Sequence, residues 1–167
     1  MAITITGSAG CNFDLQIVNT ATDTGSKTVI QQVETAVRAV TYTNASLVAV
    51  LAGQIGTEDS VIDLFSIADV TDATHNLRLQ QSVGGIVLGS LLTIVIHNKT
   101  TGSDNITVSP GDENSFLPES EQITIEPGSA AQLTYASGKT VSATVRNIKL
   151  VGDALAMACE VYILGNA

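Results

Sequence analysis

The side chains that most often carry catalysis or bind metals are few in this chain. It has two histidines, His75 and His97, and two cysteines, Cys11 and Cys159. They form no His-x-x-x-His, His-x-x-Glu or Cys-x-x-Cys spacing, and such spacings are typical of zinc sites. No serine lies in a Gly-x-Ser-x-Gly elbow of the kind that serine hydrolases use. The sequence therefore predicts no catalytic residue, no metal centre of this kind and no cofactor, and we expect a protein that is not an enzyme.

The positions of these four residues favour structural roles. His97 ends an apolar run, and His75 lies in a polar turn, where an exposed histidine with no special chemistry is the ordinary case. Cys11 and Cys159 are interpreted as buried, reduced thiols, which behave as small hydrophobic side chains. The alternative is a disulfide between them, which requires that the first and last strands be neighbours with Cα atoms within about 7 Å.

Acidic residues in predicted loops are the remaining candidates for binding an ion. Calcium takes about six to eight oxygen ligands from flexible loops. Asp104, Asp112 and Glu113 are the calcium candidates, and Asp69 and Asp72 bracket another acidic loop. None of them has the spacing of an EF-hand, so solvated turns are the competing interpretation.

Two further patterns are too sparse to predict a site. Gly102 and Gly111 are interpreted as turn glycines, because neither begins a Gly-x-Gly-x-x-Gly pattern at a helix start. Tyr42, Tyr135 and Tyr162 are isolated in predicted strands, where half-buried structural rings are more usual than a sugar-stacking platform.

The elements that would position these residues are predicted to be β-strands. The stretch from Ser90 to Ala136 alternates β-branched runs with clusters of Gly, Ser, Asn, Asp and Pro, which reverse a chain. Its first run, Leu91–Asn98, is apolar at successive positions, which indicates a strand buried on both faces. The strands predicted over the whole chain are 2–6, 12–19, 28–43, 46–52, 61–68, 77–83, 86–88, 91–98, 105–109, 122–126, 132–136, 140–145, 147–151 and 154–164.

Some connections are predicted from turn residues. A turn is expected near Asn44, a hairpin connection at residues 137–139, and a turn at Gly152-Asp153. Residues 28–43 are rich in Val and Thr, which favours a strand. A short helix within Gln31–Ala39, or one near Asp69–Asn76, is the alternative.

Short strands with regularly spaced turns predict an all-β fold, an antiparallel β-sandwich with little or no helix. No long linker divides the chain, so we expect one domain over residues 1–167, with residues 1–10 as an N-terminal arm. Ile3 and Ile5 of this arm are expected to reach a neighbouring copy, because a lone short strand gains little unless it pairs. The predicted core comprises Ile94, Ile96, Ile123, Ile125, Leu133, Val141 and Val161.

Charge limits the classes of partner. Lys and Arg number 7 against 16 Asp and Glu, which gives a net charge of −9, and only 14% of the residues are charged. The few cations are scattered, so direct binding to nucleic acid or to an anionic membrane is not expected.

The N-terminal residues lack the charged and apolar regions of a signal peptide, and no apolar run is long enough to span a membrane. A surface so poor in charge predicts association with copies of itself or with a partner; an ordinary secreted β domain is the competing interpretation.

Residues 106–138 resemble a pattern found in bacteriophage and other virion proteins. A short Thr/Val strand, Ile106–Val108, leads into a polar loop; a second strand, Ile123–Ile125, runs into Glu126-Pro127-Gly128-Ser129, and Gln132–Tyr135 follows. The resemblance covers about a quarter of the chain and implies a jelly-roll virion structural protein: a capsid, decoration or fibre-associated protein located in the virion.

The expected function is therefore that of a virion structural protein that forms a homo-oligomer and contacts other virion proteins. The alternative is a non-catalytic β-sandwich module that binds carbohydrate or protein, although that class usually presents tryptophan, which this chain lacks. An enzyme of cupin type is a third hypothesis, but it would require a histidine-rich metal cluster that two distant histidines do not supply.

Overall fold

The computed structural model describes residues 3–9, 13–19, 40–71 and 75–167, with side chains described from Ala45 onward. Every regular element in this part of the chain is a β-strand, and the prediction of an all-β antiparallel sandwich is confirmed. The strands are β1 Ile3–Ala9, β2 Phe13–Asn19, β3 Val40–Ala45, β4 Leu47–Ile55, β5 Ser60–Asp63, β6 Val70–Thr71, β7 Asn76–Val83, β8 Ser90–Asn98, β9 Ile106–Pro110, β10 Ile123–Ile125, β11 Ala130–Thr140, β12 Asn147–Gly152 and β13 Met157–Asn166.

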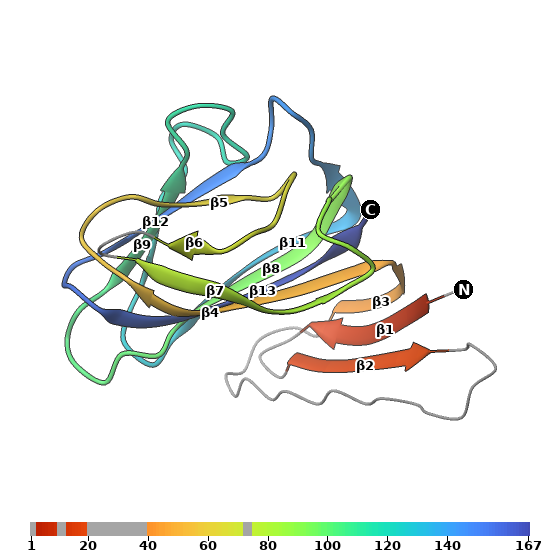
Figure 1. Cartoon of the computed structure of the whole chain (residues 1–167), viewed down its shortest axis with the longest axis horizontal. Coiled ribbons are helices and arrows are strands. Elements are labelled where there is room, and N and C mark those ends of the chain that lie inside the picture. Colours follow the sequence, from red (N-terminus) through yellow and green to blue (C-terminus); the bar gives the residue numbers. More distant parts are fainter. Residues whose placement is uncertain (1–2, 10–12, 20–39, 72–74) are drawn as a thin grey trace.

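The strands form three sheets. A four-stranded sheet has the order β10-β9-β12-β5, a six-stranded sheet has the order β11-β8-β13-β4-β7-β6, and a three-stranded sheet has the order β2-β1-β3. Figure 1 shows the four-stranded sheet above the six-stranded one, with the three-stranded sheet below the right-hand end of the six-stranded sheet. The first two sheets are the two layers of the sandwich.

Eight strands of the sandwich pair in a nested order. β4 pairs with β13 and β5 with β12, while β8 pairs with β11 and β9 with β10. Each of the first four of these strands thus pairs with one of the last four, and the partners follow in reverse order along the chain. Pairing of β13 with β8 and of β12 with β9 joins the nested pairs into two sheets. β6 and β7 are an additional hairpin on the free side of β4.

The core lies between the two sandwich sheets. Five of the seven predicted core residues are buried in one hydrophobic cluster: Ile94, Ile96, Ile125, Val141 and Val161. The other two, Ile123 and Leu133, lie on the edge strands β10 and β11; they are partly buried and pack against that cluster.

Asn98, at the end of β8, is a polar residue buried completely within this core. Its Nδ2 donates to the carbonyl oxygens of Asp104, at 3.0 Å, and Ile125, at 3.1 Å, and its Oδ1 accepts from the amide of Thr100 at 3.1 Å. Its own backbone bonds both Ser129 and Gly128 of the turn before β11. The side chain therefore joins three segments of the chain and satisfies its hydrogen-bonding groups while doing so.

The predicted strand 140–145 and the predicted hairpin at 137–139 are wrong. β11 runs through to Thr140, with an irregularity of register between Thr134 and Lys139 where Gly138 has φ 77°. A glycine with positive φ serves a bulge as well as a turn, and here it bends the strand without reversing it. The reversal comes later, where Ser142 and Val145 bond each other's backbone.

Smaller differences concern strand limits. The break expected near Asn44 falls at Ser46, and the strand expected over 61–68 ends at Asp63, where the Asp63 carboxylate accepts the amide of Phe65. The turn expected at residues 69–76 contains the two-residue strand β6. No strand forms at 86–88. The helix alternative within Gln31–Ala39 lies outside the described residues.

Candidate functional site: the second face of the six-stranded sheet

The central strands of the six-stranded sheet, β4, β8 and β13, are largely apolar on both faces. Alternate side chains of β4, β8 and β13 enter the core between the two sandwich sheets, as Leu51, Ile94 and Val161 do. The residues between them point the opposite way and are nearly all apolar too. We call this set the second face: Val48, Val50, Thr93, Val95, Tyr162 and Leu164, none of them more than 7% exposed.

The second face is built by cross-strand register. Val50 lies opposite Tyr162, and Tyr162 lies opposite Val95, so one row crosses three strands. A second row consists of Val48, Leu164 and Thr93. Thr93 donates to the carbonyl of Leu133 and bonds the Thr134 hydroxyl, both at 3.0 Å, which satisfies its buried oxygen. The prediction that residues 91–98 are buried on both faces is confirmed by the burial of β8.

Burial of the second face requires a layer other than the four-stranded sheet, which covers the first face. On that side of the six-stranded sheet, Figure 1 places β1, β2 and β3. In this three-stranded sheet β1 is the central strand, where Ile5 pairs with Ile17 of β2 and with Ala45 of β3. The side chains of Ile3 and Ile5 lie outside the described part, and their role as an oligomer arm stays a prediction.

A polar group forms one end of the second face, one register step beyond Tyr162. Glu160 of β13 lies opposite His97 of β8. Its carboxylate accepts the Tyr162 hydroxyl at 2.5 Å and pairs with the Lys99 ammonium at 2.6 Å. The Glu160 side chain is 16% exposed and that of Lys99 is 45% exposed, so the pair lies at the boundary between the sheet and solvent.

The ionisation of this group follows from its surroundings. Burial raises the pKa of Glu160, but hydrogen bonds from Lys99 and Tyr162 outweigh burial and hold that pKa below its usual range. Burial lowers the pKa of His97, with the Glu160 charge opposing the change, so the imidazole is neutral at pH 7. Burial also raises the pKa of the Tyr162 hydroxyl, and the neighbouring carboxylate adds to this. Glu160 is thus a carboxylate that accepts hydrogen bonds and is poorly suited to giving up a proton near neutral pH.

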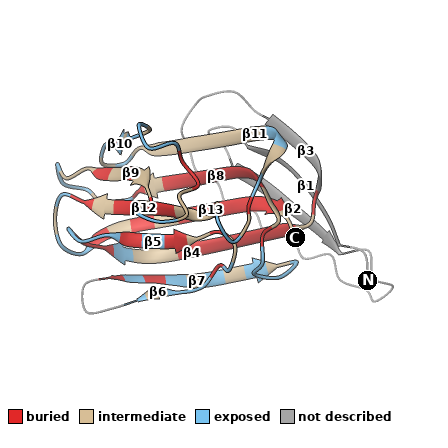
Figure 2. Ribbon diagram, turned by 90° about the horizontal axis from the view of Figure 1, so that it is seen from above, coloured by how far each residue is buried: buried red, intermediate tan, exposed pale blue. Residues whose placement is uncertain are grey.

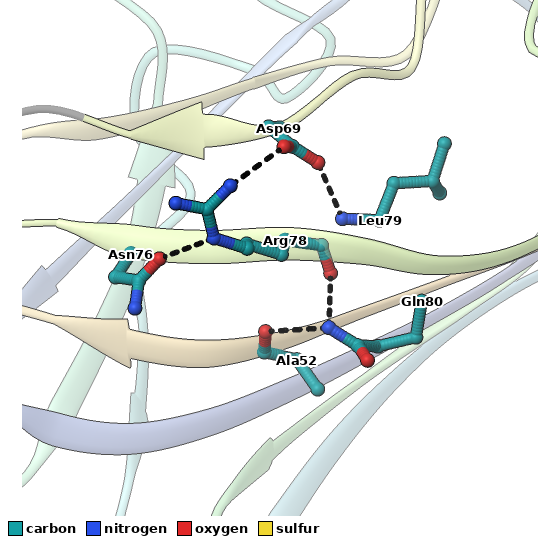
Figure 3. Close-up of polar contacts among 6 residues, drawn as sticks. All are labelled: Ala52, Asp69, Asn76, Arg78, Leu79 and Gln80. Carbon is teal, nitrogen blue, oxygen red and sulfur yellow. Dashed lines mark hydrogen bonds and ion pairs between the residues drawn. The ribbon is translucent and has the colours of Figure 1, made fainter.

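A hollow of about 530 Å³ adjoins Glu160 on the same side of the sheet. It is lined by Val50, Ala52, Gln80, Gln81 and Glu160. Figure 3 shows how Gln80 is held at this place: its Nε2 donates to the carbonyls of Ala52 and Arg78, at 3.4 and 3.2 Å. The amide is therefore engaged in joining β4 and β7.

The calcium candidates do not come together. Asp104 precedes β9, whereas Asp112 and Glu113 follow it, and the five residues of this strand separate them by roughly 16 Å at about 3.3 Å per residue. Asp112 instead pairs with Lys149 at 2.9 Å, and Asp59 pairs with the same ammonium at 3.1 Å. These hydrogen bonds raise the pKa of Lys149 and tie two loops to β12. In the described residues no cluster of three potential metal-ligating side chains occurs.

Asp69 of the other acidic loop is also engaged. Figure 3 shows its two carboxylate oxygens directed at Arg78 and at the backbone amide of Leu79, at 3.4 and 2.8 Å. The Arg78 Nε in turn donates to Asn76 at 2.8 Å. This network holds the loop before β6 against β7; Asp72 lies outside the described residues.

The expectation of an exposed His75 is wrong. His75 is 2% exposed, and its Nε2 lies 3.1 Å from the carbonyl oxygen of Glu58, a residue of the loop after β4. Of the polar neighbours that indicated an exposed turn, Thr71 and Asn76 are exposed, while the imidazole is buried.

The remaining candidates have structural surroundings. Tyr162 is buried, and the partly buried Tyr135 makes an edge-to-face contact with Phe116, with ring centroids 5.7 Å apart. Lys139 donates to the Phe116 carbonyl at 2.6 Å and lies 4.3 Å from its ring centroid. Cys159 is buried, and burial raises the pKa of its thiol to about 12. Cys11, and with it the disulfide alternative, lies outside the described residues.

Sequence reasoning missed the group around Glu160. Lys99 and Glu160 are 61 residues apart and fit no motif. One signal was present: Glu160 is the only charged residue of β13, in an otherwise uncharged strand that ends the sandwich. A lone carboxylate in such a strand needs a partner, and the first lysine after β8 provides it.

Three comparisons with known proteins were negative: no family model, no curated protein and no solved structure matches this chain. Within the described residues, no helix has the length and apolarity needed to cross a membrane.

Proposed function

We propose that this chain is a structural protein of a virus particle, a β-sandwich of the jelly-roll kind that works by associating with copies of itself. The observation that carries the proposal is the nested pairing of eight strands, β4 with β13, β5 with β12, β8 with β11 and β9 with β10. Two sheets formed by such nested strands are the arrangement of a jelly roll, which is the fold of many viral capsid domains.

Lectin domains and cupins also use this arrangement, so the surface chemistry has to support the choice. Only 23 residues of 167 are charged, 7 cations plus 16 anions. The described ion pairs tie elements of one chain to each other, as Lys149 does with Asp59 and Asp112. A surface built mainly of neutral hydroxyl, amide and apolar groups favours contact with other protein surfaces.

The net charge of −9 makes copies repel one another at long range. Association must then come from apolar burial and neutral hydrogen bonds, which act at short range. Salt screens the repulsion over about 8 Å at physiological ionic strength and about 3 Å at 1 M. Raising the salt concentration should therefore strengthen self-association or leave it unchanged.

Light scattering of the full chain over a hundredfold range of concentration, at low and high salt, tests the proposal. We expect an oligomer whose mass is maintained or grows as salt rises. A monomer under every condition would refute self-association and favour the alternative, a β-sandwich module that binds carbohydrate or another protein. An oligomer that dissociates in salt would instead show that ion pairs hold it together.

A further inference from the structure

The second face of the six-stranded sheet changes from buried to exposed along β4. Val48 is fully buried and Val50 is 6% exposed, whereas Ala52 is half-buried and Gln54 is exposed. These alternate residues of one strand point to the same side of the sheet. Figure 2 shows β7, mostly half-buried or exposed, beside the largely buried β4. The cover of the second face therefore ends near Ala52.

The hollow that adjoins Glu160 lies at this place, over a small side chain. Ala52 is directly opposite Glu160 of β13 on one side and Arg78 of β7 on the other. Neighbouring strands are about 4.8 Å apart, so two long side chains flank the methyl group of Ala52 from backbones roughly 10 Å apart. The volume of about 530 Å³ falls in the range of about 300–1,000 Å³ that is usual for sites of small ligands.

Three side chains supply hydrogen-bonding groups to this hollow. Gln81 is half-buried, and its amide makes no hydrogen bond to another described residue, so it is able to donate and to accept. Gln80 is fixed because its Nε2 donates to the carbonyls of Ala52 and Arg78, which leaves its Oε1 as an acceptor (Figure 3). Glu160 accepts one bond at each carboxylate oxygen and retains lone pairs for further bonds.

The charges around the hollow favour a neutral ligand. The Lys99 ammonium lies 2.6 Å from the Glu160 carboxylate, so a cationic ligand would have to compete with it. An anionic ligand would meet this carboxylate and the net charge of −9. Hydroxyl groups both donate and accept, so several of them on one ring match the amide and the acceptors together. The apolar side of such a ring would pack on Val50 and Ala52.

We propose that this hollow binds a neutral sugar of the size of one hexopyranose ring, with the Gln81 amide as its main hydrogen-bonding partner. The described lining includes no aromatic ring, so the binding is weak, in the millimolar range. Many copies of a weak site on one particle would act together on a surface that carries sugars. The inference goes beyond the proposed function and does not depend on self-association.

Titration of the isotope-labelled full chain, followed by the NMR signals of its backbone amides, tests this site. The probes are methyl glucoside, methyl galactoside, methyl mannoside and N-acetylglucosamine, each up to about 50 mM. We expect at least one of them to shift the signals of Ala52 and Gln81 in a saturable way. Glycerol at the same concentration should not, because it has hydroxyl groups but no ring.

Two substitutions locate the binding. Gln81→Ala should weaken it about three- to tenfold, because it removes one or two neutral hydrogen bonds to the ligand and none within the described protein. Ala52→Leu, which fills the hollow, should weaken it at least about tenfold. Gln122→Ala, at an exposed glutamine outside the hollow, is the matched control and should bind as the wild type does. Circular dichroism with thermal melting establishes that each variant is folded, and Gln81→Ala alone decides the location if Ala52→Leu does not fold.

Each contrary result overturns a stated part of the inference. If none of the four sugars binds, or if glycerol gives equal shifts, the hollow is not a sugar site. Binding that is unchanged in folded Gln81→Ala would refute its location. Methylguanidinium chloride serves as a cationic probe, and saturable binding of this cation without binding of any sugar would refute the neutral class of ligand. Self-association is measured separately by light scattering, so it stands or fails on its own result.

Discussion

Replacing Asn98 removes a fully buried side chain that makes three hydrogen bonds, to Asp104, Ile125 and Thr100. Each bond contributes about 1 kcal/mol net, and a buried partner left unsatisfied costs about 1–3 kcal/mol. Asn98→Ala should therefore lower the free energy of unfolding by roughly 3–5 kcal/mol. Asn98→Leu, which leaves a smaller cavity, should be nearly as destabilising, because the loss comes from unpaired carbonyl and amide groups.

Urea unfolding monitored by circular dichroism measures this difference, and a typical domain with about 5–15 kcal/mol of stability would still fold after the loss. Asn76→Ala is the matched control, since Asn76 is exposed and accepts one bond from the exposed Arg78. We expect the control to change stability by less than about 0.5 kcal/mol. If Asn98→Leu were as stable as the wild type, apolar packing alone would stabilise the surroundings of Asn98, and the reasoning from hydrogen bonds would be refuted.

Three further changes test other parts of the structure. Ile163→Ala, at a fully buried site, should lower the free energy of unfolding by about 3–5 kcal/mol, and Leu133→Ala, at a partly buried site on the edge strand, by about 1–3 kcal/mol. Equal losses of stability in denaturant unfolding would contradict an effect of this difference in burial. Because folding lowers the pKa of Glu160, its ionised carboxylate stabilises the fold at pH values above the pKa that Glu160 has in the unfolded chain, and this stabilisation is lost as pH falls through its pKa in the folded protein. Glu160→Gln should therefore make the free energy of unfolding depend less steeply on pH on the acid side. An unchanged slope would count against this role of Glu160. With Cys11 replaced by serine, Cys159 should resist a thiol reagent at pH 8 until the protein unfolds, because it is buried and its pKa is about 12; rapid labelling of the folded protein would contradict this.

Much of the strand arrangement could be predicted from the sequence because turns are marked by residue type. Residues 91–98 and 147–151 were predicted almost to the residue as β8 and β12, since Gly, Asn or Ser stands at their limits. Successive apolar residues in β8 also indicated burial on both faces, which the structure confirms. Gly138 shows the limit of such reasoning: a glycine marks a place where the backbone bends, but a bulge and a hairpin use the same residue.

The polar group on the second face could not be predicted in the same way. Glu160, Lys99 and His97 become neighbours only through the register between β8 and β13. A shift of that register by one residue would send Glu160 into the core, so the pair depends on tertiary pairing rather than on local sequence. The same holds for Asn98, whose side chain bonds the backbone carbonyls of Asp104 and Ile125 as well as the nearby amide of Thr100.

The structure also bears on how much rearrangement association through the N-terminal arm would demand. β1 pairs with β2 on one side and β3 on the other, so an N-terminal arm that reaches a neighbour must first give up both sets of backbone hydrogen bonds. Exchange of identical arms between copies restores those bonds, but only after the three-stranded sheet has opened, which makes the process slow. Arm exchange should therefore require partial unfolding and form more slowly than an ordinary encounter between folded proteins.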